Sequence, residues 1–157
     1  MLSTKRMVSA SMDYTQDQIL EALTRATTTI NSRNGETVYG YNCCWALVVE
    51  YDTELRGERA ILELQYNSPQ EFSEAVTAAG FKDFSELSTH YNYTEVRNKR
   101  PKIGDVAYTI LDNGCISALI VGKTRWLTAT GSKGVRHLHQ WSFLERHIPL
   151  ITRPQRC

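Results

Sequence analysis

The spacing of apolar residues changes partway along the chain, from a helical repeat to short β-type runs. Up to about residue 92 the apolar positions recur every three or four residues, which is the repeat of one buried helix face. From about residue 103, short apolar runs are separated by glycine-containing turns, as in strands joined by hairpins. Helices followed by sequential strands predict an α+β fold, with N-terminal helices packed on a C-terminal antiparallel β-meander.

Four helices are predicted in the first part. One spans about 14–32 with Asp13 as its N-cap, and the next begins at Cys44. A third follows a Ser-Pro-Gln-Glu capping box at 68–71, and a short fourth helix covers about 83–89. The apolar repeat therefore places Cys44 in the first turn of a helix, on the side that packs.

Five strands are predicted in the second part, and an Asp-Asn-Gly turn joins the first two of them. They lie at about 106–111, 115–121, 125–130, 135–138 and 148–152. A helical turn is expected between the last two strands.

The length of 157 residues favours a single domain. We expect a flexible segment at 1–12 and one domain at 13–157, with a helical part at 13–92 and a sheet part at 103–152. Eighteen Lys and Arg against 17 Asp and Glu leave a net charge of +1, which gives no whole-protein argument for a nucleic-acid or membrane partner. The sequence has no apolar run long enough to span a bilayer and no secretory signal at its start, so no membrane is expected.

Several short motifs resemble one enzyme family. Asn42–Val48, which reads NCCWALV, is similar to the nucleophile helix of NlpC-type papain-fold hydrolases, in particular the phage-encoded members. Pro101–Val106, PKIGDV, resembles the family's Pro-x-x-Gly-Asp-Val segment, and Ala118–Gly122 resembles its Gly-Ile-x-x-Gly strand. The resemblance covers about 40–58 and 100–154. It implies a papain-like fold in which Cys44 is a thiolate nucleophile, activated at a helix N-terminus.

The chain departs from this family at the catalytic base. The family's histidine position, at the start of the second strand, holds Ile116 or Ser117, and the orienting position in the third strand holds Thr128. None of these side chains shuttles a proton near neutral pH. His137 and His139, one strand later, are the candidate substitutes. A hydrolase without its base is slow, so the sequence favours a degenerate site over an active one.

The cysteines also have a structural interpretation. Free cysteine is among the most buried residue types, and this interpretation of Cys44 is favoured over a reactive thiol. The four cysteines and four histidines do not fall at metal-ligand spacing. We therefore expect no metal and no cofactor.

A basic hinge separates the two parts of the chain. From residue 97 onward there are eleven Lys and Arg against three Asp and Glu. Such a surface binds phosphate backbones or acidic protein partners, or pairs with the acidic helical part of the same chain. The candidate binding residues are Arg97, Lys99, Arg100, Lys102, Trp45 and Trp126.

Together these features favour a phage-type NlpC-like domain with a degraded cysteine-hydrolase site. It would act by protein binding, as a tail or virion assembly component or as the ligand of a host protein. We expect it in the host cytoplasm or in a virion assembled there. Two alternatives stay open. One is an active cysteine amidase or endopeptidase that cuts cell-wall peptide with Cys44. The other, less favoured, is a nucleic-acid-binding module that uses the basic second part.

Overall fold

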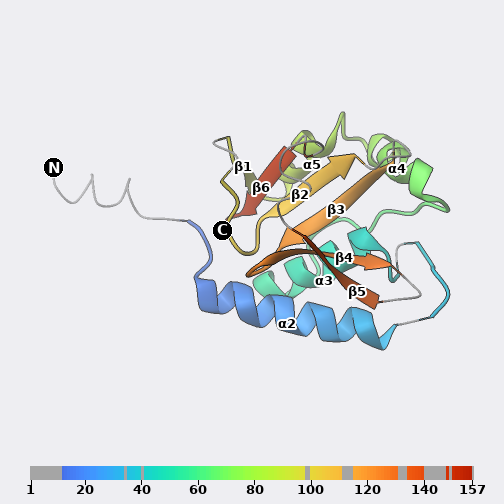
Figure 1. Cartoon of the computed structure of the whole chain (residues 1–157). Helices are drawn as coiled ribbons and strands as arrows, with labels where there is room; N and C mark the ends of the chain where they lie inside the picture. Colours follow the sequence, from blue (N-terminus) through green and yellow to red (C-terminus); the bar gives the residue numbers. More distant parts are fainter. Residues whose placement is uncertain are drawn as a thin grey trace, which may run out of the picture.

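The computed structural model confirms an α+β architecture (Figure 1). It describes residues 12–33, 35–39, 41–97, 100–110, 115–130, 134–139, 148 and 150–156, with the side chains of Thr130 and His139 left out. The helices are α2 (Gln16–Ser32), α3 (Cys44–Arg56), the 3-10 helix η1 (Pro69–Glu71), α4 (Phe72–Ala78) and α5 (Phe84–His90). The expected flexible segment, the turns at 112–114 and 131–133, and the helical turn at 141–146 lie outside the described residues.

One antiparallel sheet holds all the described strands, in the order β1-β6-β2-β3-β4-β5. The strands are β1 (Tyr93–Glu95), β2 (Val106–Ile110), β3 (Ile116–Val121), β4 (Arg125–Thr130), β5 (Gly134–His139) and β6 (Leu150–Pro154).

The meander prediction holds for β2 to β5 and is wrong for the last strand. β6 does not pair with β5. It returns to the other side of β2, where Thr152 lies opposite Val106 and its hydroxyl donates to the Val106 carbonyl at 2.9 Å. The short strand β1, which was not predicted, then pairs with β6. Apolar alternation marks a strand but does not identify its neighbours, so this return connection is not encoded in the local pattern.

Two helix starts differ in detail from the expectation. Thr15, and not Asp13, caps α2, in a reciprocal capping box with Gln18. The Asp13 carboxylate instead accepts a hydrogen bond from the Gln155 side chain, which joins the two ends of the described chain. At the third helix the Ser68 hydroxyl makes no capping bond, and a 3-10 turn precedes α4.

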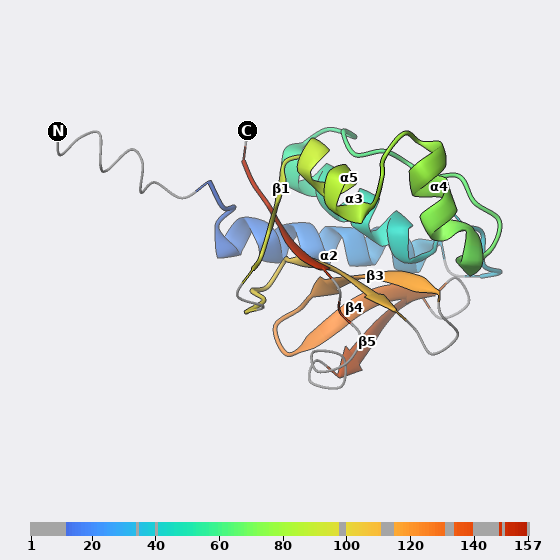
Figure 2. The same cartoon turned by 90° about the horizontal axis from the view of Figure 1, so that it is seen from above.

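The helices gather on one side of the sheet, and α3 lies at the centre of the fold (Figure 2). The main core is built around α3, whose Trp45 and Tyr51 are fully buried. A second, smaller apolar cluster contains the fully buried Trp126 together with Leu119 and Val121. No helix in the described part of the chain is long and apolar enough to cross a membrane.

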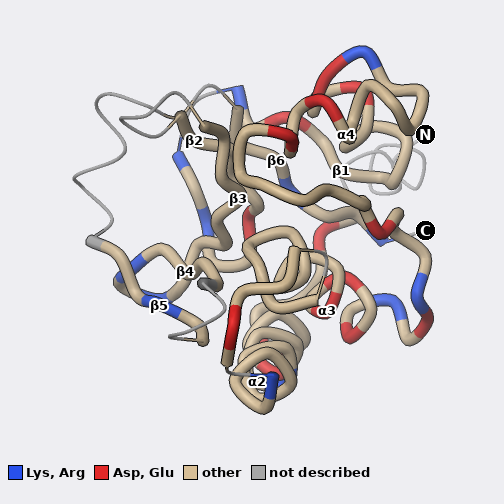
Figure 3. Tube along the Cα trace, turned by 90° about the vertical axis from the view of Figure 1, so that its right-hand side faces the viewer, with Lys and Arg blue, Asp and Glu red and all other residues tan. Residues whose placement is uncertain are grey.

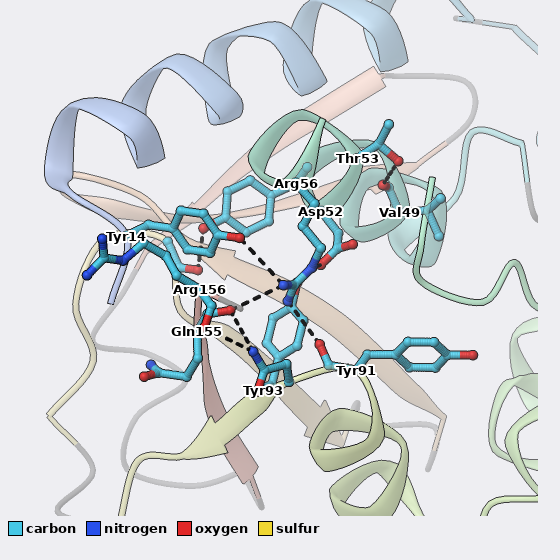
Figure 4. Close-up of polar contacts among 12 residues, drawn as sticks. Tyr14, Val49, Asp52, Thr53, Arg56, Tyr91, Tyr93, Gln155 and Arg156 are labelled. Atoms are coloured by element: carbon cyan, nitrogen blue, oxygen red, sulfur yellow. Dashed lines mark hydrogen bonds and ion pairs between the residues drawn. The ribbon is translucent and has the colours of Figure 1, made fainter. Parts of the chain in front are cut away.

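The C-terminal end of α3 is fixed by a buried charged network (Figure 4). The Arg56 guanidinium donates to the Asp52 carboxylate at 2.9 Å and to the backbone carbonyls of Tyr91 and Gln155 at 2.9 and 3.2 Å. The Tyr93 hydroxyl donates to the same Asp52 oxygen at 2.7 Å. One helix turn therefore connects α3 to the segment after α5 and to the C-terminal strand.

We expect Arg56→Met to lower the free energy of unfolding by about 3–5 kcal/mol, because it leaves the fully buried Asp52 carboxylate without its cation. Urea denaturation measures this. The matched control is Arg25→Met, which removes a pair that is more than half exposed and should change stability by less than about 0.5 kcal/mol. An equal effect of the two substitutions would contradict the role given to Arg56.

Candidate functional site

The two adjacent cysteines at the start of α3 point to different surroundings. Cys43 is the extended N-cap residue, and its buried thiol lies 2.8 Å from the Tyr66 hydroxyl. Cys44 is the first helical residue and lies against β3, where its sulfur accepts a hydrogen bond from the Ala118 N–H at 3.5 Å. The sequence correctly placed Cys44 in the first turn, facing the packed side of the helix.

The sheet opens where Cys44 meets it. β3 and β4 pair at only two positions, Ile120 with Leu127 and Val121 with Trp126. Val121 exchanges backbone hydrogen bonds with the segment that leads into β2. Because bonding direction alternates along an antiparallel strand, the N–H and C=O of Ala118 point the other way, toward β4. At that position β4 is no longer paired with β3.

Two side chains replace the missing backbone partners of Ala118. The Cys44 sulfur accepts from its N–H, and the Thr128 hydroxyl donates to its carbonyl at 3.1 Å. A buried peptide group without partners costs roughly 1–3 kcal/mol, so these contacts stabilise the opening between the strands. Cys44 and Thr128 thus have a structural role in the gap between β3 and β4.

Burial raises the pKa of the Cys44 thiol to about 11, and the neighbouring Cys43 adds to this. Hydrogen bonds from the backbone of Ala118, the side chain of Ser117 and the backbone of Trp45 act in the opposite direction but do not offset the desolvation. At neutral pH the site therefore holds a neutral thiol, not the thiolate that nucleophilic catalysis requires.

A pocket of about 390 Å³ lies in front of this thiol. Both cysteines line it, together with aromatic side chains such as Tyr66 and Phe72. Ile116, Ser117 and Thr128, the positions that the motif resemblance compares with a base and its orienting group, also line it. The described lining includes no histidine and no carboxylate, and its one charged side chain belongs to Arg136.

The structure does not bring the candidate histidines to the thiol. His137 is exposed on β5, opposite Leu127, and makes no hydrogen bond with Cys44. β5 is two strands from β3, about 10 Å at the usual strand spacing. The backbone of His139 lies two residues further along β5, where it pairs with Arg125. The nucleophile–base pair required by the active-enzyme alternative is therefore not formed between Cys44 and His137.

The tryptophans considered for ligand stacking are core residues. Trp45 and Trp126 are both fully buried, which corrects the expectation that they face a ligand. The Trp45 indole N–H donates to the Leu62 carbonyl at 2.8 Å. In both helices and strands, an aromatic residue at a periodic position is more often interior than exposed.

The basic hinge is on the surface. Arg97, Arg100 and Lys102 are exposed, and Lys99 lies outside the described residues. Lys102 lines a cavity of about 540 Å³ near the start of α2, whose charged centre is the pair between Asp105 and Arg153. The two groups are joined by two hydrogen bonds of 2.8 and 2.9 Å, so the cavity offers no unpaired carboxylate there.

Two features of the site were not predicted. Arg136 lines the pocket, and the Tyr66 hydroxyl contacts the Cys43 thiol, yet both residues come from segments without a recognisable motif.

Among the described residues, no cluster of three or more His, Cys, Asp or Glu side chains could hold a metal ion. Searches against family models, curated proteins and solved structures found no match for this chain.

We expect Cys44 to react with iodoacetamide on the order of 100-fold more slowly than N-acetylcysteine at pH 7.5, because a pKa of about 11 leaves little thiolate. The rate should rise about tenfold per pH unit toward pH 11 while the fold persists. Peptide mapping by mass spectrometry gives the rate at each cysteine. Labelling of Cys44 faster than the free thiol would show an activated nucleophile.

Thr128→Val should lower the free energy of unfolding by about 1–2 kcal/mol, because the Ala118 carbonyl loses its donor at nearly constant side-chain volume. Thr94→Val, at an exposed position on β1, serves as the control and should change stability by less than about 0.5 kcal/mol. Urea denaturation of both variants makes the comparison. If Thr128→Val leaves the free energy of unfolding unchanged, this hydroxyl does not stabilise the gap between β3 and β4.

Proposed function

We propose that this chain is a phage-type NlpC-like domain with a degenerate hydrolase site, and that it acts by binding protein. The partner is either a tail or virion component or a host protein. One observation carries the proposal. Cys44 is a partly buried thiol that accepts a hydrogen bond from the sheet backbone. Ile116, Ser117 and Thr128, at the positions matched to the family's base and orienting group, line the same pocket.

The local arrangement supports a family relationship better than the motifs alone do. The motif resemblance concerns separate segments of sequence, and it assigns Cys44, either Ile116 or Ser117, and Thr128 to one site. All four residues line one pocket, although they come from a helix and two different strands.

The chemistry of the pocket favours binding over hydrolysis. General base catalysis contributes about 10²–10⁴-fold to a rate, and no described side chain in the pocket can supply it. The raised pKa of Cys44 removes most of the nucleophile as well. The nucleic-acid alternative loses its proposed stacking residues, because Trp45 and Trp126 are buried, and it rests on basic surface charge alone.

Cys44→Ala tests the proposal directly. We expect wild type and Cys44→Ala to release no more product from a soluble cell-wall stem peptide than a no-protein control, measured by liquid chromatography. The tagged variant should also recover the same partners from infected cells as wild type does. Hydrolysis that Cys44→Ala abolishes would establish the amidase alternative instead.

A further inference from the structure

Among the described strands, β5 forms the longer open edge of the sheet. The sheet order leaves β1 and β5 with one neighbour each, and β1 has only three residues against six in β5. An edge strand presents unpaired backbone groups that an extended chain can use as a template. The edge beside β5 is therefore the place where this fold can add a strand.

The direction of the β5 backbone groups can be worked out from one contact. The N–H of Val135 donates to the side-chain oxygen of Asn31 on α2 at 2.8 Å, so this group points away from β4. By alternation, the N–H and C=O of His137, and those of the last residue of the strand, also point outward. α2 thus covers only the first outward N–H, and the edge beyond it is open in the described part of the chain.

The charge along this edge has one sign. The sequence from 113 to 144 holds four Lys and Arg and no Asp or Glu. Arg125, Arg136 and His137 are exposed, and neither arginine forms an ion pair with any described carboxylate. Figure 3 shows basic residues and no acidic ones on β4 and β5. Arg136 and His137 are consecutive, so they project from opposite faces of the sheet.

These features select one kind of occupant. Two copies of β5 paired edge to edge would bring like charges together, which disfavours a dimer through this strand. An incoming strand with carboxylates on both of its faces would instead meet Arg136 on one face and Arg125 with His137 on the other. Its backbone would use the outward groups of β5.

We propose that β5 is the docking edge for an extended, acidic segment of a partner protein, which adds a seventh strand to the sheet. The proposal rests on the binding function proposed above and specifies the surface and the chemistry of its partner. The pocket beside Cys44 is continuous with this edge through Arg136 and Leu138, which line it. A side chain of the docked segment can therefore reach the pocket.

The test uses two blocked octapeptides with the ¹⁵N-labelled full chain. One repeats Glu-Glu-Val-Val and the other Lys-Lys-Val-Val, so that each presents its charges on both faces of an extended strand. At saturation, the acidic peptide should slow hydrogen exchange of the His137 amide at least tenfold and leave Thr94, on the opposite edge, unchanged. The lysine peptide should have neither effect. Unchanged exchange at His137 would overturn the proposal.

Three variants keep the test independent of folding. The double substitution Arg125→Glu and Arg136→Glu should weaken binding of the acidic peptide at least tenfold and favour the lysine peptide. Lys82→Glu, a single exposed charge reversal on the loop before α5, should leave the affinity unchanged. His137→Pro removes one outward donor at a position where an edge strand tolerates proline, and it should weaken binding of the acidic peptide at least tenfold.

Other results identify other occupants and would overturn the acidic-strand proposal. Tighter binding of a twelve-residue thymidine oligonucleotide than of the acidic peptide would identify a nucleic acid. Concentration-dependent dimerisation that His137→Pro abolishes would identify a second copy of the chain. The outcome is separable from that for the proposed function. If the chain binds the acidic peptide and also hydrolyses stem peptide, only the proposed binding function is contradicted. If it does not hydrolyse stem peptide and does not bind the acidic peptide, only the docking edge is contradicted.

Discussion

The site depends on one peptide group, that of Ala118, which faces a gap where β3 and β4 part. Its N–H donates to the Cys44 sulfur and its C=O accepts from the Thr128 hydroxyl. The first contact fixes the first turn of α3 against β3, and the second bridges the gap between β3 and β4. Burial of the sulfur raises the pKa of the Cys44 thiol and keeps it neutral at pH 7, although the hydrogen bond from Ala118 acts in the opposite direction.

The two ends of α3 are held by different forces. At its start, the Cys44 thiol joins it to β3. At its end, the ion pair of Arg56 and Asp52 joins it to the chain segments around β1 and β6. Gly57 then ends the helix in the left-handed conformation, with φ of 74°, which glycine adopts without strain. A helix fixed at both ends positions Cys44 firmly, which suits a binding scaffold as well as an enzyme.

Much of the architecture could be predicted from the sequence, since local periodicity and stop signals are written in adjacent residues. The position of Cys44 in its helix and the four sequential strands β2 to β5 follow from such signals. Contacts between distant segments could not be predicted. The placement of β6 beside β2, the short strand β1, and the gap at Ala118 depend on which strands pair and for how long.

The protonation of Cys44 is the most direct test of the account. With cysteine labelled at ¹³Cβ, the chemical shift of Cys44 can be followed by NMR from pH 6 upward while amide spectra monitor the fold. The account predicts that the carbon keeps its thiol shift through pH 9 and changes only on approach to pH 11. A midpoint below pH 7 would show a stabilised thiolate, contradict the neutral thiol of this account, and favour the hydrolase alternative.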